Sequence, residues 1–362
     1  AKNGSNFKMI LVAGLLVLDL TALVFQKSKV PFLALLIFLW FVFVFSNGLA
    51  DDFNYSLHLM NPTLAQDKGI GYSLLIKFLS DCGATLFQLK LLVGTFYLVS
   101  IGLCGWNLTK RPGLFLALYS IFPFCMDAVQ LRFSLAISFV LIGYLYVSKA
   151  KGGLKKKAAV FFFACLIGFS FHAAVLFFAL LLFAKELSHR DVRKLCILVF
   201  LGLIVVTRTS LLTQIATLLG VSARLNMVGG VDGSGFANVI RLAVPSLAWM
   251  AFGLYLKKTR GDSNAVRVIL NANLFCLALI PLVGVASDIY RIETSQFLIY
   301  YLVAVNSVSC AGGSNIRKEQ ADLFGVACLL GIALMGVTLL VLLSMNLNTV
   351  LVPLLTSNSI LV

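Results

Sequence analysis

The chain has 362 residues, of which 60% are apolar and 12% are charged, and its formal net charge is +15. A soluble globular chain carries about 25% charged residues, so water is excluded as the main solvent of this protein. The positive charge does not indicate nucleic-acid binding, because the Lys and Arg residues occupy short stretches between apolar runs. No C-x-x-C spacing occurs in the sequence, and we expect neither a metal nor another cofactor.

The apolar runs have the length that a membrane-spanning helix needs, about 20 residues for about 30 Å of hydrocarbon. They lack the two-residue alternation of a membrane barrel strand. The sequence therefore predicts an all-α, polytopic integral membrane bundle in which residues 1–362 form one transmembrane domain with about 12 spanning helices. The predicted helices are 9–25, 30–46, 86–105, 113–126, 131–147, 158–171, 172–184, 195–211, 239–256, 266–286, 289–309 and 323–345.

A lysine-rich loop sets the predicted orientation. Five lysines fall between residues 149 and 157, and positive loops stay on the cytoplasmic side of a membrane. Counting helices outward from this loop puts every other basic loop on the same side and both termini outside. These basic loops contain Lys27/Lys29, Lys110/Arg111, Lys185/Arg190/Arg193/Lys194, Lys257/Lys258/Arg260 and Arg317/Lys318.

Two helical hairpins are too short for two full spans. Residues 158–184 lie between basic loops that must share a side, so we predict a hairpin of two short helices with its tip at 169–172 sunk below the outer surface. The pair 113–126 and 131–147 has a similar form, and its tip carries Asp127, Gln130 and Arg132. Two recessed polar tips are therefore expected to face the outside.

The longer connections are predicted to lie outside. Residues 47–85 form an outer loop with an amphipathic stretch at 69–80, whose Ile70, Leu74, Leu75 and Phe78 have helical spacing and suit a helix in the membrane interface. Residues 212–238 form a second outer loop, and its glycine run lacks the Lys-Ser/Thr of a phosphate loop. The tail 346–362 is expected to pack back onto the outer face.

Three arginines, Arg132, Arg241 and Arg291, lie at or just inside the outer ends of predicted helices. Each alone is equally well explained by a side chain that reaches up to the headgroups. A charged side chain inside a span costs about 2.5–3.5 kcal/mol. Three arginines without a matching number of carboxylates close by in sequence favour an anionic ligand such as the diphosphate of a lipid headgroup. Asp288 and Glu293 flank Arg291, so neutralisation of Arg291 by one of them is the alternative.

Other polar residues have two open interpretations. His172 at a hairpin tip is either a structural hydrogen-bonding residue or a proton acceptor near neutral pH. Asp51 and Asp52 are either a solvated helix end or groups that act as base or acid, bind a cation or orient sugar hydroxyls. Gln130 shares a ligand with Arg132 only if the helix start is irregular. Asp19 is expected to contribute to helix packing.

Several motifs occur in an order that resembles the EpsG-type polysaccharide polymerases, within the wider Wzy group of repeat-unit polymerases. The motifs are DDFNY (51–55), GYSLLIKF (71–78), QLRFSLA (130–136), a lysine loop, FHAAVLF (171–177) and IYR (289–291). The resemblance covers residues 45–300. It departs at SNGLADD, which lacks an Arg before the Asp, and at Gly69, where a Glu is usual.

The resemblance implies an enzyme of the bacterial cytoplasmic membrane whose active site faces the outside. It would transfer a growing glycan from undecaprenyl diphosphate to a lipid-linked repeat unit of a capsule, O-antigen or exopolysaccharide, without a metal. Its partners would be undecaprenyl-diphosphate-linked oligosaccharides and membrane lipids, with a chain-length regulator and a flippase as candidate protein partners and no nucleic acid. The implied catalytic residues are Asp52, Arg132, His172 and Arg291, and the implied substrate-binding residues are Asp51, Tyr55, Tyr72, Gln130, Arg241 and Tyr290.

Within that reading, Arg132 and Arg291 hold the diphosphates and His172 or Asp52 is the base. Two rival functions stay open. A flippase for the same lipid-linked glycan would need a polar path to the cytoplasmic half, whereas the polar residues gather on the outer side. A membrane ligase or another transferase shares the donor chemistry, and the acceptor is not readable from the sequence.

Overall fold

The computed structural model describes residues 2–151, 153–209, 234–283, 290–308, 316–339 and 347–358. In this part of the chain the regular structure is helical, and the helices form two compact units. Unit 1 comprises residues 1–179 and 308–362, and unit 2 comprises residues 180–307. The all-α prediction is confirmed.

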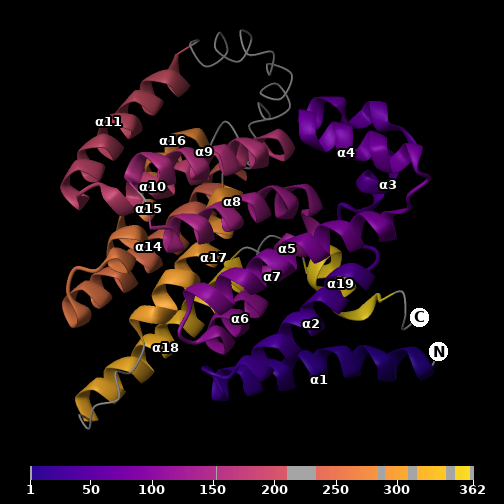
Figure 1. Ribbon diagram of the computed structural model, residues 1–362, viewed down its shortest axis with the longest axis horizontal. Coiled ribbons are helices and arrows are strands. Elements are labelled where there is room, and N and C mark those ends of the chain that lie inside the picture. The colour runs from indigo at the N-terminus through magenta and orange to yellow at the C-terminus, as the bar shows by residue number, and fades with distance from the viewer. Residues whose placement is uncertain are drawn as a thin grey trace. The chain divides into compact units, whose positions relative to one another are not determined.

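Unit 1 begins with the N-terminal helices and closes with the C-terminal ones (Figure 1). Its elements are α1 (Lys2–Val24), α2 (Lys29–Phe45), α3 (Asp52–Met60), the 3-10 helix η1 (Pro62–Lys68), α4 (Ile70–Asp81), α5 (Leu86–Leu108), α6 (Pro112–Ile121), α7 (Phe124–Val129), α8 (Leu131–Lys149), α9 (Leu154–Phe171), the 3-10 helix η2 (Ala173–Ala179), α18 (Ile316–Val337), the π-helix η5 (Leu347–Leu351) and α19 (Val352–Thr356). Helix α8 packs between α5 and α9, and α2 packs on α5.

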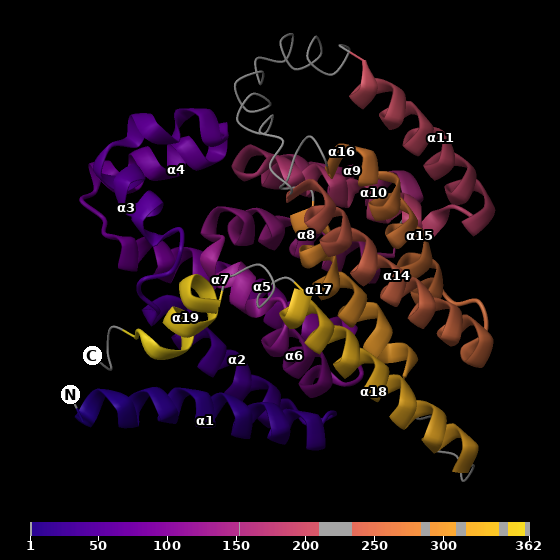
Figure 2. The same ribbon diagram turned by 180° about the vertical axis from the view of Figure 1, so that it is seen from behind.

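The C-terminal tail packs on the N-terminal part of unit 1, as Figure 2 shows for α19 beside α1 and α2. The N–H of Asn47 donates to the carbonyl of Ser357 at 2.7 Å, and the N–H of Ala50 donates to the carbonyl of Thr349 at 3.0 Å. The described part of the tail therefore covers the segment that leads into α3.

Unit 2 consists of α10 (Leu180–Glu186), α11 (His189–Arg208), α14 (Ser234–Arg260), α15 (Asn264–Ala278), α16 (Ile280–Val283) and α17 (Tyr290–Ser307). Helix α15 contacts α10, α11, α14 and α17. The indole of Trp249 is fully buried, with its ring centroid 4.9 Å from that of Tyr300 and 5.5 Å from that of Tyr301. Aromatic packing therefore joins α14 to α17.

Three described helices are long and apolar enough to cross a membrane by length and composition: Leu86–Leu108, Leu131–Lys149 and Phe236–Arg260. Shorter apolar helices accompany them at Leu11–Val24, Lys29–Phe45, Pro112–Ile121, Asn264–Ala278 and Asp322–Val337. The chain is thus a helical membrane protein with several apolar helices.

Some predicted helices are interrupted. The range 113–126 was expected to be continuous, but α6 ends at Ile121 and α7 starts at Phe124, because Pro123 has no N–H to donate and disfavours helical geometry at Phe122. Residues 173–179 form a 3-10 helix before α10, so the second limb of the 158–184 hairpin is not a single α-helix. The range 266–286 divides at Leu279 into α15 and α16.

Other predictions differ at the boundaries. Helix α11 starts at His189 rather than 195, because the Ser188 side chain caps it by accepting from the N–H of Asp191 at 3.2 Å. Helix α14 starts at Ser234, so the predicted loop 212–238 is shorter at its end, and residues 212–233 of that loop lie outside the described part of the chain. In the outer loop 47–85, α4 confirms the predicted helix at 69–80, while α3 and η1 were not predicted.

Candidate functional site

The candidate site is built where α3, η1 and α4 meet the start of α8 in unit 1. Tyr55 and His58 come from α3, Lys68 ends η1, Tyr72 comes from α4 and Arg132 from the first turn of α8. We call these five residues the Arg132 cluster. All four helical elements contribute to it, so their packing fixes the cluster.

The Arg132 guanidinium is held by two neighbours. Its Nη1 donates to the carbonyl oxygen of Lys68 at 3.1 Å, and its Cζ lies 5.6 Å from the centre of the Tyr72 ring, in cation–π range. The backbone N–H of Arg132 donates to the Tyr55 hydroxyl at 3.3 Å. The side chain is half-buried. Arg132 thus has a defined place at a helix N-terminus, where the backbone itself favours an anion.

A Tyr-His pair lies beside this arginine. His58 Nδ1 and the Tyr72 hydroxyl are 3.0 Å apart. Burial lowers the pKa of His58, and the charges of Lys68 and Arg132 lower it further. Burial also raises the pKa of Tyr72 well above its usual value. His58 is therefore neutral and Tyr72 protonated at pH 7, so the pair can pass a proton.

The loop that contains His172 reaches the same end of unit 1. The His172 ring stands edge-on to Phe133, the neighbour of Arg132, with centroids 5.2 Å apart, and its Nδ1 accepts from the N–H of Ala174 at 3.3 Å. A Cβ on Gly69 would lie 2.6 Å from the carbonyl oxygen of Ser170, so only glycine lets α4 approach the end of α9 this closely. The two polar hairpin tips therefore share one end of unit 1.

Asp52 is a partner in a buried ion pair. Lys90 Nζ lies 2.7 Å from Asp52 Oδ1 and 2.8 Å from Oδ2, and it also donates to the carbonyl of Ser46 at 2.7 Å. The N–H of Leu49 donates to Asp52 Oδ2 at 3.0 Å. Side-chain exposure is 1% for Lys90 and 11% for Asp52. The carboxylate charge is thus compensated by α5, and the pair fixes the start of α3.

The remaining predicted residues are distributed over both units. Asp51 occupies the N-cap position of α3 and Gln130 that of α8, and neither side chain forms a capping hydrogen bond. Gln130 has φ −94° and ψ 61°, so the start of α8 is irregular, as a shared ligand for Gln130 and Arg132 requires. In unit 2, Arg241 on α14 donates from Nη1 to Asn238 Oδ1 at 2.7 Å. The side chains of Tyr290 and Arg291, in the first turn of α17, lie outside the described part of the chain. The roles predicted for Arg241, Tyr290 and Arg291 stay predictions.

Two residues of this region were missed as site candidates. Lys90 lies one turn inside an apolar helix, which is a sequence signal for a buried partner. His58 lies six residues after Asp52 in the outer loop, and only the packing of α3 on α4 brings it to Tyr72.

Asp19, expected to help helix packing, accepts from the Ser120 hydroxyl of α6 at 2.5 Å. In the described residues no group of three His, Cys, Asp or Glu side chains could hold a metal ion.

The fold and the cluster define a helical membrane protein with a polar site at one end of its first unit. Residues 29–353 match the EpsG family. The chain belongs to this family, which is linked to exopolysaccharide biosynthesis. Comparisons with curated proteins and with solved structures gave no match.

Proposed function

We propose that this protein is a polysaccharide polymerase that transfers a growing glycan from undecaprenyl diphosphate to a lipid-linked repeat unit. The observation that carries the proposal is the Arg132 cluster, an oriented guanidinium at a helix N-terminus beside a Tyr-His pair, in a chain of the EpsG family. The leaving group is a lipid diphosphate that gains negative charge in the transition state. Preorganised positive donors stabilise such charge.

Arg132 is the proposed diphosphate ligand. A guanidinium has five N–H donors, and its bond to Lys68 uses Nη1, so the group can bind a phosphate while its orientation is kept. The cation–π contact of Arg132 with Tyr72 restricts the side chain before substrate binds. This preorganisation lowers the cost of binding and needs no metal.

His58 is the proposed base for the acceptor hydroxyl. When His58 Nδ1–H donates to the Tyr72 oxygen, Nε2 is the basic nitrogen of a neutral ring. His172 differs, because the N–H of Ala174 directs its Nδ1 to act as acceptor, and the neutral ring then bears its hydrogen on Nε2. We therefore assign His172 to hydrogen-bond donation toward substrate. Asp52 is assigned to holding the start of α3 through Lys90.

The proposed orientation has the Arg132 cluster outside and about 12 spanning helices. This orientation is supported by three contacts that place basic residues at the end of unit 1 opposite the Arg132 cluster. Lys29 Nζ lies 4.0 Å from the centre of the Trp106 ring, Arg111 donates to Gln26 at 2.9 Å, and Lys149 donates to Asn107 at 2.5 Å. Positive residues at one end predict the cytoplasmic side there. Both termini and the active site would then face out from the bacterial cytoplasmic membrane.

The test measures surface polysaccharide length in cells that lack the protein and are complemented at equal protein levels. Deletion should leave single repeat units, and wild type should restore long chains. Arg132→Gln is expected to lower polymerisation at least about 100-fold, since removing one donor to a developing oxyanion costs that much. Lys77→Gln, which changes an exposed cation of α4 outside the cluster, is the matched control and should retain activity.

Each other outcome points to another function. Intact polymer that stays unattached after deletion would identify a ligase, and repeat units trapped on the cytoplasmic side would identify a flippase. His58→Asn retains an N–H donor for the Tyr72 oxygen but has no base, so we expect at least about 100-fold loss. Full activity of His58→Asn would return the base role to His172.

A further inference from the structure

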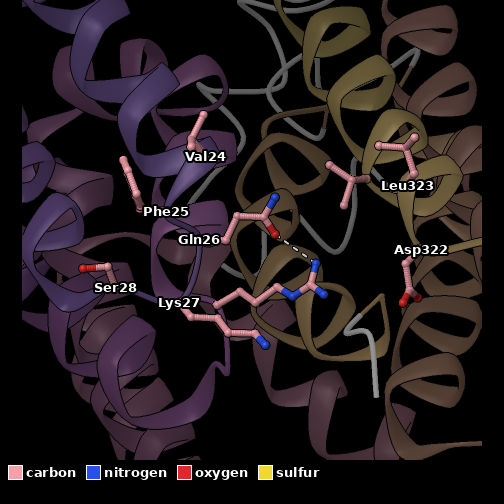
Figure 3. A pocket seen from close by; sticks show the side chains of 9 residues that line it. Val24, Phe25, Gln26, Lys27, Ser28, Asp322 and Leu323 are labelled. Atoms are coloured by element: carbon pink, nitrogen blue, oxygen red, sulfur yellow. Dashed lines mark hydrogen bonds between the residues drawn. The ribbon is translucent and has the colours of Figure 1, made fainter. Parts of the chain in front are cut away.

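A cavity of about 630 Å³ lies in unit 1 at the end opposite the Arg132 cluster. Its walls are the turn after α1, the start of α6 and the first half of α18 (Figure 3). Helix α2, with 17 residues, separates this end from the Asp52 end by about 25 Å at 1.5 Å per residue. The cavity therefore has no part in the proposed transfer site.

The inner wall carries a buried cation. Arg111 is only 6% exposed, its Nη1 donates to Gln26 Oε1 at 2.9 Å, and its Nε has no hydrogen-bond partner in the described part of the chain. The dashed line at Gln26 in Figure 3 marks the bond to Arg111. No described carboxylate forms an ion pair with Arg111. A buried charge of this kind needs a counter-charge.

The charged residues that line the cavity carry a net positive charge. Lys27 is exposed in the turn after α1, and the buried Asp322 on α18 has an interaction of its own. Two cations and one carboxylate therefore line the cavity. This charge balance suits a ligand with one negative group, and a guanidinium and an ammonium are both common phosphate ligands.

The rim of the cavity is apolar and exposed. Val24 is 73% exposed, Phe25 58% and Leu323 72%. Side chains exposed on the apolar helices of a membrane protein meet lipid chains, so a ligand with acyl tails would cover them. The volume lies within the range of about 300–1,000 Å³ that holds a small-molecule ligand. Inorganic phosphate would use the cations and leave the apolar rim bare.

We propose that this cavity binds the headgroup of an anionic glycerophospholipid, with the phosphate against Arg111 and Lys27 and the acyl chains over Val24, Phe25 and Leu323. Such a lipid joins three elements that the chain links only through long connections: the α1–α2 turn, α6 and α18. The site is independent of the glycan chemistry, so binding can be measured whether or not the polymerase proposal holds.

The experiment is native mass spectrometry of the purified full-length protein in detergent, titrated with phosphatidylglycerol and, in parallel, with phosphatidylcholine. Wild type should retain phosphatidylglycerol in preference. Arg111→Gln, which retains a donor for Gln26, should lower phosphatidylglycerol retention about tenfold, as loss of one charge-assisted interaction predicts. Lys110→Gln changes the neighbouring exposed cation outside the lining and should retain the lipid.

A second variant separates the cavity from general surface attraction. Val326→Phe adds volume to the α18 wall without changing charge, so a specific cavity predicts the same loss as Arg111→Gln. Equal loss in Lys110→Gln and Arg111→Gln, or full retention in Val326→Phe, would overturn the proposal. Displacement of the lipid by millimolar inorganic phosphate as readily as by glycerophospholipid would also overturn it, because the site would then recognise phosphate alone.

Discussion

The buried Lys90–Asp52 pair allows a quantitative test of how the start of α3 is held. In Lys90→Met the Asp52 carboxylate stays buried with the Leu49 N–H as its described backbone donor and without its cation. Removing one partner of a buried pair destabilises a protein by about 3–5 kcal/mol, because the other charge is left uncompensated. We expect Lys90→Met and Asp52→Asn each to unfold at a temperature several degrees below wild type.

The double variant distinguishes pairing from a catalytic role. Replacing both charges by neutral groups removes the interaction and both desolvation costs, so Lys90→Met with Asp52→Asn should recover most of the lost stability. The coupling energy of this cycle is then about 3 kcal/mol or more. If Asp52 only holds α3, polymer formation should recover together with stability.

The assay is thermal unfolding of the four proteins in detergent, followed by intrinsic fluorescence, with polymer length measured in complemented cells. Single variants that melt with wild type would refute the buried-pair reasoning. A double variant that is stable but inactive would instead restore Asp52 to the catalytic set that the family resemblance implies.

Three further predictions use the same melting assay. Gly71→Ala should destabilise the protein by about 1–3 kcal/mol, because the added Cβ would overlap the Ser170 hydroxyl. Ser170→Gly should restore stability to Gly71→Ala but not to Gly69→Ala, whose Cβ meets the backbone carbonyl of Ser170. Failure of Ser170→Gly to rescue Gly71→Ala would contradict the predicted contact. His58 has a lowered pKa in the folded protein, so stability linked to its neutral form is present above about pH 6.5 and is lost as pH falls through the folded pKa. In His58→Asn the melting temperature should therefore fall less steeply on the acid side of its pH profile. A pH profile of the melting temperature that is the same as in wild type would count against the lowered pKa. Ser120→Ala leaves the Asp19 oxygen of α1 without its hydroxyl donor and should lower the free energy of unfolding by about 1–3 kcal/mol. Ser100→Ala is the control and should have a milder effect, because the Ser100 hydroxyl donates to carbonyls of its own helix.

Local signals in the sequence predicted most of the helices. Apolar length marked the helices that became α2, α5 and α8, and the spacing of Ile70, Leu74 and Phe78 marked α4. These three side chains are 77%, 63% and 64% exposed, while Tyr72, Ile76 and Leu79 on the other face are buried. The amphipathic pattern was therefore sufficient because it depends only on spacing along one helix.

Some helix boundaries were predicted wrongly because the lengths of apolar runs were used and single-residue signals were overlooked. Pro123 divides the predicted helix 113–126, and the Ser188 cap starts α11 early. Both effects follow from the backbone chemistry of single residues and were readable from the sequence. The 3-10 geometry after His172 is different, because residues 173–179 have no breaker and carry the same apolar composition as an α-helix.

The site required contacts between distant parts of the chain. The sequence by itself determined that this is a helical membrane protein and that Arg132 lies at the start of a helix. Only the tertiary structure decided that Asp52 pairs with Lys90, 38 residues away, and that Tyr55 meets Arg132, 77 residues away. Burial of a charge requires some partner, but the choice of partner depends on how α3, α5 and α8 pack, and the spacing of residues along the chain does not contain that information.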